Sequence, residues 1–348
     1  MVIKITTLSR PSIKNKNGHF FFMKNYSKPT DDKIKDHSDQ SNFNALELFN
    51  LKIDTVPKLV EPFFQKSGLA SLVGTSDTGK STFLRQLSLA IVLGKADFIG
   101  FKLNPKHHRV IYVSTEDGPH SVSHSIRKQI KTIKDKKDDL DLIKNLTFLF
   151  DTENLHERLE LMISEYPVDL IVIDAFTDVY THEINANTQV RKFLNTYDTL
   201  AKQHDCLIVF LHHTGKRTQN NKPSKDNIIG SQAFEAKMRV VMELRSSSRN
   251  SSQKDLWVLK SNFLESEQKD KCHILNFSKD LTFSNSGHKG TKSVASKSNN
   301  IKILNKVLEL YQGGTSFRKI EETLKGTEFE ISKSAANKLI NEHKKGGN

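Results

Sequence analysis

The sequence has 348 residues, of which 36% are hydrophobic and 27% are charged, and its 53 Lys and Arg against 40 Asp and Glu give a net charge of +13. The longest apolar runs, such as residues 170–173, fall far short of the roughly 20 residues that a membrane span needs, and no secretory signal is recognisable, so we expect a cytoplasmic protein without a membrane segment. Two cysteines, Cys206 and Cys272, exclude a disulfide framework. The positive charge fits a nucleic-acid partner or simple solubility, and by itself does not separate the two.

Residues 1–44 are polar and show no sustained period, which predicts a disordered extension. In residues 45–285, short apolar runs alternate with helix-like stretches, the pattern of an α/β domain with a mainly parallel central sheet flanked by helices. Two amphipathic helices are predicted at 81–93 and 190–204. The strands predicted for the parallel sheet are 69–73, 110–114, 146–150, 170–174, 207–212 and 239–244.

After this core, residues 257–260, 272–277 and 281–283 are expected to be antiparallel strands at one edge of the sheet. The Ser-, Lys- and Gly-rich stretch 286–300 is predicted to be a linker. A small C-terminal module of helix-turn-helix or winged-helix type is expected in residues 301–345, with helices at 301–311, 316–324 and 332–343 and Ser332 as an N-cap.

Residues 74–81 fit the pattern G-x-x-x-x-G-K-[ST], directly after a predicted strand and at the start of a predicted helix. In this context the backbone N–H groups and the helix N-terminus surround the phosphates of a nucleotide. Lys80 is expected to reach the β- and γ-phosphates, and Ser81 to hold Mg²⁺. The predicted nucleotide-binding residues are Gly74, Thr75, Ser76, Asp77, Thr78, Gly79, Lys80, Ser81 and Thr82.

Two other predicted strands end in carboxylates, at the edge where ligands bind in open α/β sheets. Asp174 closes the run Leu-Ile-Val-Ile-Asp and is expected to hold Mg²⁺ through water. Glu116 follows the strand at 110–114 and is the candidate general base for the attacking water. Glu116 or its neighbour Asp117 could instead cap the helix that begins near Pro119.

The strand at 207–212 ends with His212, and it is followed by His213 and by a polar loop at 216–226. One histidine could contact the γ-phosphate, whereas a metal site would need further ligands. The loop at 216–226 suits a grip on single-stranded DNA, although an ordinary solvated loop would have the same composition. The cations of this loop are Lys216, Arg217, Lys222 and Lys225.

Together these motifs resemble the AAA_25 or RepA-like branch of the RecA-type P-loop ATPases, whose best-known members are hexameric replicative helicases of plasmids and mobile elements. The resemblance covers residues 57–283. It is carried by Glu61-Pro62-Phe63, by residues 74–81, 114–118, 170–174 and 211–216, and by Gly230-Ser231-Gln232-Ala233-Phe234 through Arg239. It implies a RecA-like fold, with ATP and Mg²⁺ as cofactors.

The resemblance also assigns roles to single residues. His213 corresponds to the histidine that contacts the γ-phosphate, and Arg239 to the arginine that reaches into the neighbouring subunit's site. The sequence departs from related helicases at Lys260-Ser261-Asn262, where Asn262 replaces a second cation, so Arg239 and Lys260 are alternatives for the trans-acting cation. The implied catalytic residues are Lys80, Glu116, Asp174, His213 and Arg239.

Three functions fit these observations. The first is a homohexameric DNA helicase or translocase for replication of a plasmid, phage or mobile element. The second is an ATP-switched DNA-binding regulator or partition-type protein, whose C-terminal module would bind duplex DNA through Lys333, Lys338, Lys344 and Lys345. The third is a RadA- or KaiC-like recombination or signalling ATPase, which would share the same core.

Overall fold

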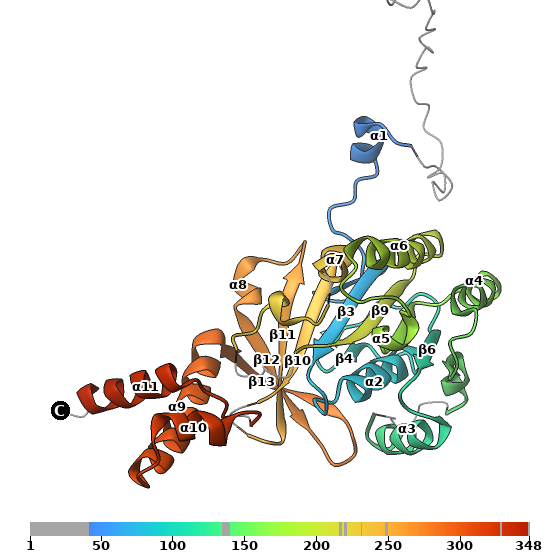
Figure 1. Cartoon of the computed structure of the whole chain (residues 1–348). Helices are drawn as coiled ribbons and strands as arrows, with labels where there is room; N and C mark the ends of the chain where they lie inside the picture. The colour runs from blue at the N-terminus through green and yellow to red at the C-terminus, as the bar shows by residue number, and fades with distance from the viewer. Residues whose placement is uncertain are drawn as a thin grey trace, which may run out of the picture. The chain divides into compact units, whose positions relative to one another are not determined.

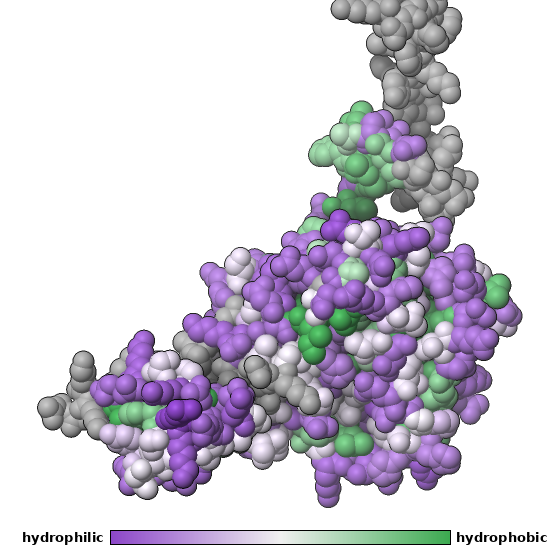
Figure 2. All heavy atoms as spheres, in the orientation of Figure 1, coloured by the Kyte–Doolittle hydropathy of each residue, from purple (hydrophilic) through white to green (hydrophobic). Residues whose placement is uncertain are grey.

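The computed structural model describes residues 42–133, 140–215, 218, 221–230, 232–247, 250–327 and 329–346. The chain divides into a unit that ends at Asp54 and a unit that begins at Thr55. The first unit holds α1 (Ala45–Asn50), whose start is fixed by a capping box between Asn44 and Glu47. Figure 2 shows the apolar side chains of this helix at the surface. Of the extension predicted for residues 1–44, residues 1–41 lie outside the described residues.

The second unit is built on a nine-stranded sheet with the order β13-β12-β11-β10-β3-β9-β8-β6-β7 (Figure 1). The strands from β10 to β7 in this order run parallel. Strands β11, β12 and β13 extend the sheet beyond β10, each antiparallel to the strand before it. The mainly parallel sheet predicted from the apolar runs is therefore confirmed. The strands are β3 (Gly68–Gly74), β6 (Val110–Ser114), β7 (Leu146–Leu149), β8 (Leu170–Asp174), β9 (Leu207–His213), β10 (Val240–Ser246), β11 (Gln253–Ser261), β12 (Lys271–Phe277) and β13 (Phe283–Thr291).

Helices cover both faces of this sheet, so alternate residues of a strand enter two different cores. On β3, Ala70 and Leu72 pack into one core with Leu84 of α2, and Leu69 packs into the other with Leu194 of α6. Burial on both faces explains why the strands are almost wholly apolar. The helices are α2 (Lys80–Val92), α3 (Pro119–Ile133), α4 (Leu155–Glu165), α5 (Phe176–Val179), α6 (Asn187–Gln203) and α7 (Gln232–Lys237).

Short elements complete the unit: β1 (Lys58–Val60), β2 (Phe64–Gln65), β4 (Asp97–Phe98), β5 (Phe101–Lys102), α8 (Ser266–Lys269), and 3₁₀ turns at Leu140–Asn145 and Lys225–Asn227. Across the described ranges, no helix combines the length and the apolar character that crossing a membrane requires.

The stretch 286–300 is not the linker that its composition predicts. Its first part belongs to β13, and the rest lies in α9 (Lys292–Gln312). Among the described strands, β13 pairs with β12 alone and is the last strand of the sheet, so it needs no continuous apolar face. Its Ser, Gly and Lys residues therefore gave no strand pattern in the sequence. The C-terminal helices α9, α10 (Phe317–Leu324) and α11 (Lys333–Gly346) share a small core of their own around Val307, Ile320, Leu324, Ala336 and Ile340.

Candidate functional site

The loop between β3 and α2 has the backbone of a phosphate cradle. Gly74, Asp77 and Gly79 all have positive φ, at 157°, 61° and 91°. A Cβ on Gly74 would lie 2.4 Å from the carbonyl oxygen of Leu244, so only glycine fits where the loop leaves the sheet. Gly79 directly precedes α2, which directs the free N–H groups of the first helical turn toward the loop. The glycines of the motif therefore meet a geometric requirement.

Lys80, the first residue of α2, is buried inside this loop. Its Nζ donates a hydrogen bond to the carbonyl oxygen of Thr75 at 2.8 Å. Burial lowers the pKa of Lys80, and the charges of Asp174, Glu116 and Asp77 act in the opposite direction. A desolvated ammonium group beside unpaired backbone N–H groups is a strong binding site for phosphate oxygens.

Four parallel strands bring three other predicted residues, Glu116, Asp174 and His213, to the carboxyl ends of the strands beside the phosphate loop. Gly74 pairs with His213 across β3 and β9, and Ser114 pairs with Asp174 across β6 and β8. Because β9 lies beside β8, the phosphate loop, the histidine and both carboxylate-bearing strand ends adjoin one another. The sheet register thus gathers residues that are far apart in the sequence.

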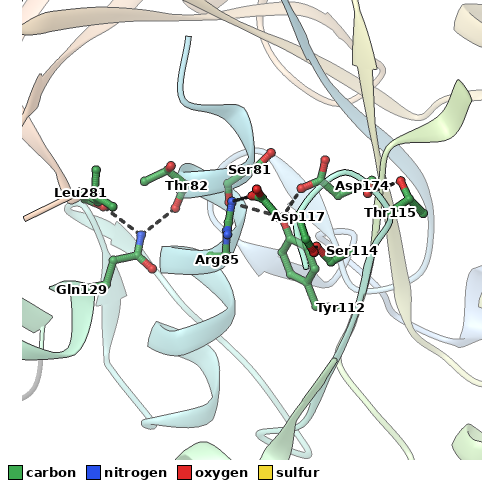
Figure 3. A network of polar contacts seen from close by, with 10 residues as sticks. All are labelled: Ser81, Thr82, Arg85, Tyr112, Ser114, Thr115, Asp117, Gln129, Asp174 and Leu281. Carbon is green, nitrogen blue, oxygen red and sulfur yellow. Dashed lines mark hydrogen bonds and ion pairs between the residues drawn. The ribbon is translucent and has the colours of Figure 1, made fainter. Parts of the chain in front are cut away.

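Asp174 is buried and belongs to the polar network shown in Figure 3. The hydroxyl of Tyr112 donates to its Oδ2 at 2.6 Å, while its Oδ1 is buried with no hydrogen-bond partner among the described residues. Burial raises the pKa of Asp174, and hydrogen bonds from Tyr112 and Ser81 act in the opposite direction. A buried carboxylate oxygen without a partner, beside the Ser81 hydroxyl, fits the oxygen-donor environment of Mg²⁺.

Glu116 and Asp117 are adjacent in sequence but have different partners. The carboxylate of Asp117 binds Nη2 of Arg85 on α2 at 2.7 Å (Figure 3). Glu116 remains about half exposed, and its Oε1 lies 3.4 Å from Nε2 of His213. Asp117 therefore joins α2 to the loop after β6, while Glu116 faces the histidine.

The two histidines at the end of β9 also differ. His212 is fully buried, and its Nε2 contacts the carbonyl oxygen of Ile229 at 2.8 Å. Burial lowers the pKa of His212 to about 4, so it is neutral at physiological pH. His213 is the one near Glu116. Among the described His, Cys, Asp and Glu residues, no group of three is arranged to hold a metal ion.

Arg239 and Lys260 lie at the amino ends of the parallel strands, whereas the phosphate loop lies at their carboxyl ends. The N–H of Arg239 donates to the carbonyl oxygen of Leu69 at 2.8 Å, near the start of β3. Lys260 pairs with Val241 at the start of β10. At about 3.3 Å per strand residue, Leu69 and Gly74 are roughly 16 Å apart. Neither cation can therefore reach the phosphate loop of its own chain.

The polar loop after β9 is tied to the rest of the site through its backbone. The N–H of Thr214 donates to the carbonyl oxygen of Gly74 at 3.3 Å. On β10, Arg245 donates to the carbonyl oxygen of Asn221 at 2.6 Å and lies 2.7 Å from the buried carboxylate of Glu243. Of the loop cations, Lys222 and Lys225 are exposed, and Lys216 and Arg217 lie outside the described residues.

Sequence reasoning missed several residues that shape this site. Tyr112 and Arg85 both contact predicted site residues, and Arg245 anchors the polar loop. Tyr112 was detectable as the one hydroxyl-bearing side chain among the apolar residues that precede Ser114 in its strand. Arg85 lies one helical turn after Ser81, on the face of α2 that turns toward the site.

Comparisons with known proteins identify the family and the fold of the chain. The family model AAA_25, described as an AAA domain, matches residues 38–219, more than half of the chain. No curated protein matches the sequence. Among solved structures, one described as an ATPase domain is similar at 12% identity with a TM-score of 0.50, and the match covers 69% of this chain and 95% of that one. At this identity the likeness concerns the fold.

Proposed function

Because the chain belongs to the AAA_25 family of AAA domains and has a RecA-like P-loop ATPase fold, we propose that it is an ATP-hydrolysing motor that acts on single-stranded DNA. The working form is a homohexamer, and the task is replication of a plasmid, phage or mobile element. One observation carries the proposal: the phosphate loop and Arg239 lie at opposite ends of the parallel strands. A complete ATPase site then needs two subunits, as in a ring.

Each residue of the proposed site has a distinct task. Lys80 binds the β- and γ-phosphates, and Ser81 and Asp174 hold Mg²⁺, which when bound neutralises charge on the phosphates. Glu116 orients the attacking water and accepts its proton. His213 lies between Glu116 and the start of the polar loop, where it can sense the γ-phosphate. Arg239 of one subunit stabilises the transferring phosphoryl group in the next.

Coupling to DNA is supported by the attachment of the polar loop. The loop begins directly after His213, and Thr214 is hydrogen-bonded to Gly74 of the phosphate loop. A shift of the phosphate loop on hydrolysis is thereby passed to the segment that carries Lys216, Arg217, Lys222 and Lys225. We propose that these cations bind the phosphates of a single strand.

The test is ATPase activity with and without single-stranded DNA, on protein whose oligomeric state is measured in parallel. We expect hydrolysis to depend on Mg²⁺, to rise when DNA is added, and to disappear in Lys80→Ala. Activity in a verified hexamer that does not respond to single-stranded DNA would refute the motor.

A second candidate, an ATP-switched DNA-binding regulator, is favoured by one observation. Helices α9 to α11 enclose their own apolar core, and Ser316 and Ser332 cap the last two helices. Lys333 and Lys338 are exposed on α11, where they could meet duplex phosphates. Unwinding of a forked substrate supports the motor, whereas tight duplex binding without unwinding supports the regulator. Filaments instead of rings would favour a recombination-type ATPase.

A further inference from the structure

One carboxylate on α7, that of Glu235, lies between a cation of the candidate DNA loop, Lys225, and a cation of β11, Lys260. Oε2 of Glu235 is 3.4 Å from Nζ of Lys225 in the polar loop. Its Oε1 is 3.2 Å from Nζ of Lys260 at the end of β11. The side chains of Glu235 and Lys260 are 16% and 21% exposed, whereas that of Lys225 is 51% exposed. Glu235 is therefore a shared counter-ion, with its more accessible partner on the candidate DNA loop.

Lys260 has further partners on the same helix. Its Nζ donates to the carbonyl oxygens of Glu235 and Ala236 at 2.9 Å and 3.1 Å. These carbonyls are in the last turn of α7, where a cation is favourable. The carbonyl oxygen of Glu235 also accepts a hydrogen bond from the N–H of Met238 at 3.2 Å. Lys260 thus acts as a cap that fixes the end of α7 within its own chain.

Arg239 is placed by the same helix end. It follows Lys237, the last residue of α7, by two positions, and it is exposed. Within the described part of the chain, only its backbone N–H is held, by Leu69. Lys260 is engaged in its own subunit while the guanidinium of Arg239 is available, which favours Arg239 over Lys260 as the trans-acting cation.

We propose that Glu235 is a positioning residue that couples DNA binding at Lys225 to the presentation of Arg239. This inference rests on the proposed function. A DNA phosphate that binds Lys225 competes with the Glu235 carboxylate, which then pairs with Lys260 alone. The stronger pair fixes the end of α7 and, with it, Arg239. Coupling of this kind is reciprocal, so changes at Glu235 and Lys260 must alter the affinity for DNA.

The experiment measures binding of a fluorescent oligothymidylate to the full chain with a non-hydrolysable ATP analogue. In Glu235→Gln, Lys225 loses its competitor, so we expect the affinity to rise by about two- to fivefold, the effect of one partly exposed ion pair. In Lys260→Gln, Glu235 pairs only with Lys225, so the affinity is expected to fall by about twofold. General loosening of α7 would move both variants in the same direction.

Three controls complete the test. Glu235→Asp keeps the charge and is expected to stay near wild type. Lys225→Ala should abolish the gain of Glu235→Gln in the double variant. Asp198→Asn removes another shared carboxylate, which binds Lys237 of α7 at 2.7 Å and Lys202 at 2.8 Å but does not touch Lys225, so it should not raise the affinity. DNA-stimulated ATPase is recorded alongside, and Glu235→Gln is expected to need less DNA for half-maximal activity and to reach a lower maximum.

The proposed function and the coupling through Glu235 can be refuted separately. A wild-type protein that does not bind the oligonucleotide overturns the proposed function and, with it, the coupling. A wild type that binds, together with Glu235→Gln and Lys260→Gln variants that shift in the same direction or not at all, overturns the coupling alone. A gain in Glu235→Gln that survives in the Lys225→Ala background overturns it as well.

Discussion

Replacement of Arg239 by alanine tests whether the ATPase site is shared between subunits. The residue is exposed, and its one contact among the hydrogen bonds of the described residues is made by the backbone, which alanine retains. The free energy of unfolding should therefore change by no more than about 0.5 kcal/mol. Hydrolysis should fall by about a thousandfold or more, equivalent to at least about 4 kcal/mol of transition-state stabilisation.

Mixing variants distinguishes a trans-acting arginine from one that acts in its own chain. Neither Lys80→Ala nor Arg239→Ala should hydrolyse ATP alone. When equal amounts of the two variants form mixed rings at random, a site works only where a subunit with an intact Lys80 adjoins a neighbour with an intact Arg239. Each condition is met by half of the subunits, so about a quarter of the sites recover if the sites act independently. Arg239→Lys should rescue poorly, because lysine lacks the planar fork of arginine.

The assay is steady-state ATPase activity after the two variants are dissociated and reassembled together, with mixed assembly verified by mass. Recovery near a quarter of the wild-type rate is expected. No recovery in verified mixed rings, or an Arg239→Ala variant within twofold of wild type, would show that the arginine has no such role.

Three other predictions follow from the phosphate site. Asp174→Asn should retain the fold but lose ATPase activity by a hundredfold or more, and added Mg²⁺ should not restore it; a rate within tenfold of wild type would exclude Asp174 as a metal partner. Tyr112→Phe removes a hydrogen bond that lowers the pKa of Asp174, so the pKa of Asp174 should rise. Because activity needs the ionised carboxylate, the acidic limb of the pH–rate profile should move to higher pH. An acidic limb at the wild-type pH would contradict this prediction. Gly74→Ala would force a Cβ to within 2.4 Å of Leu244; we expect a lower Tm and loss of nucleotide binding by fluorescence titration, and wild-type affinity would show that the loop relaxes.

The sequence predicted the parallel core well because burial on both faces leaves few alternatives to continuous apolar runs. Strands β6 and β8 have the predicted bounds. Strand β13 was largely missed, since an edge strand is stabilised by backbone pairing on one side and needs no apolar pattern. Local composition predicts what a segment buries, but not which backbone it pairs with.

In the candidate site, too, local features could be predicted from the sequence and long-range contacts could not. The phosphate loop could be predicted because its physics is local, with glycines and a lysine in one turn. The pairing of Asp117 with Arg85, and of Glu235 with Lys225 and Lys260, depends on the approach of segments that are distant in the chain. Charged residues on polar segments have the same appearance in a sequence whether they are solvated or paired, so these contacts required the structure.

Strand β10 joins the parts of the proposed motor. Near its carboxyl end, Leu244 abuts the first glycine of the phosphate loop, and Arg245 holds the backbone of the polar loop at Asn221. Just before its amino end lies Arg239. The strand is paired with β3 on one side and β11 on the other, so its two ends cannot move independently. In the proposed mechanism, a displacement at the phosphate loop reaches Arg239, and through it a neighbouring subunit, if the pairing of β10 stays intact. Rigidity of β10 is therefore a requirement of that mechanism.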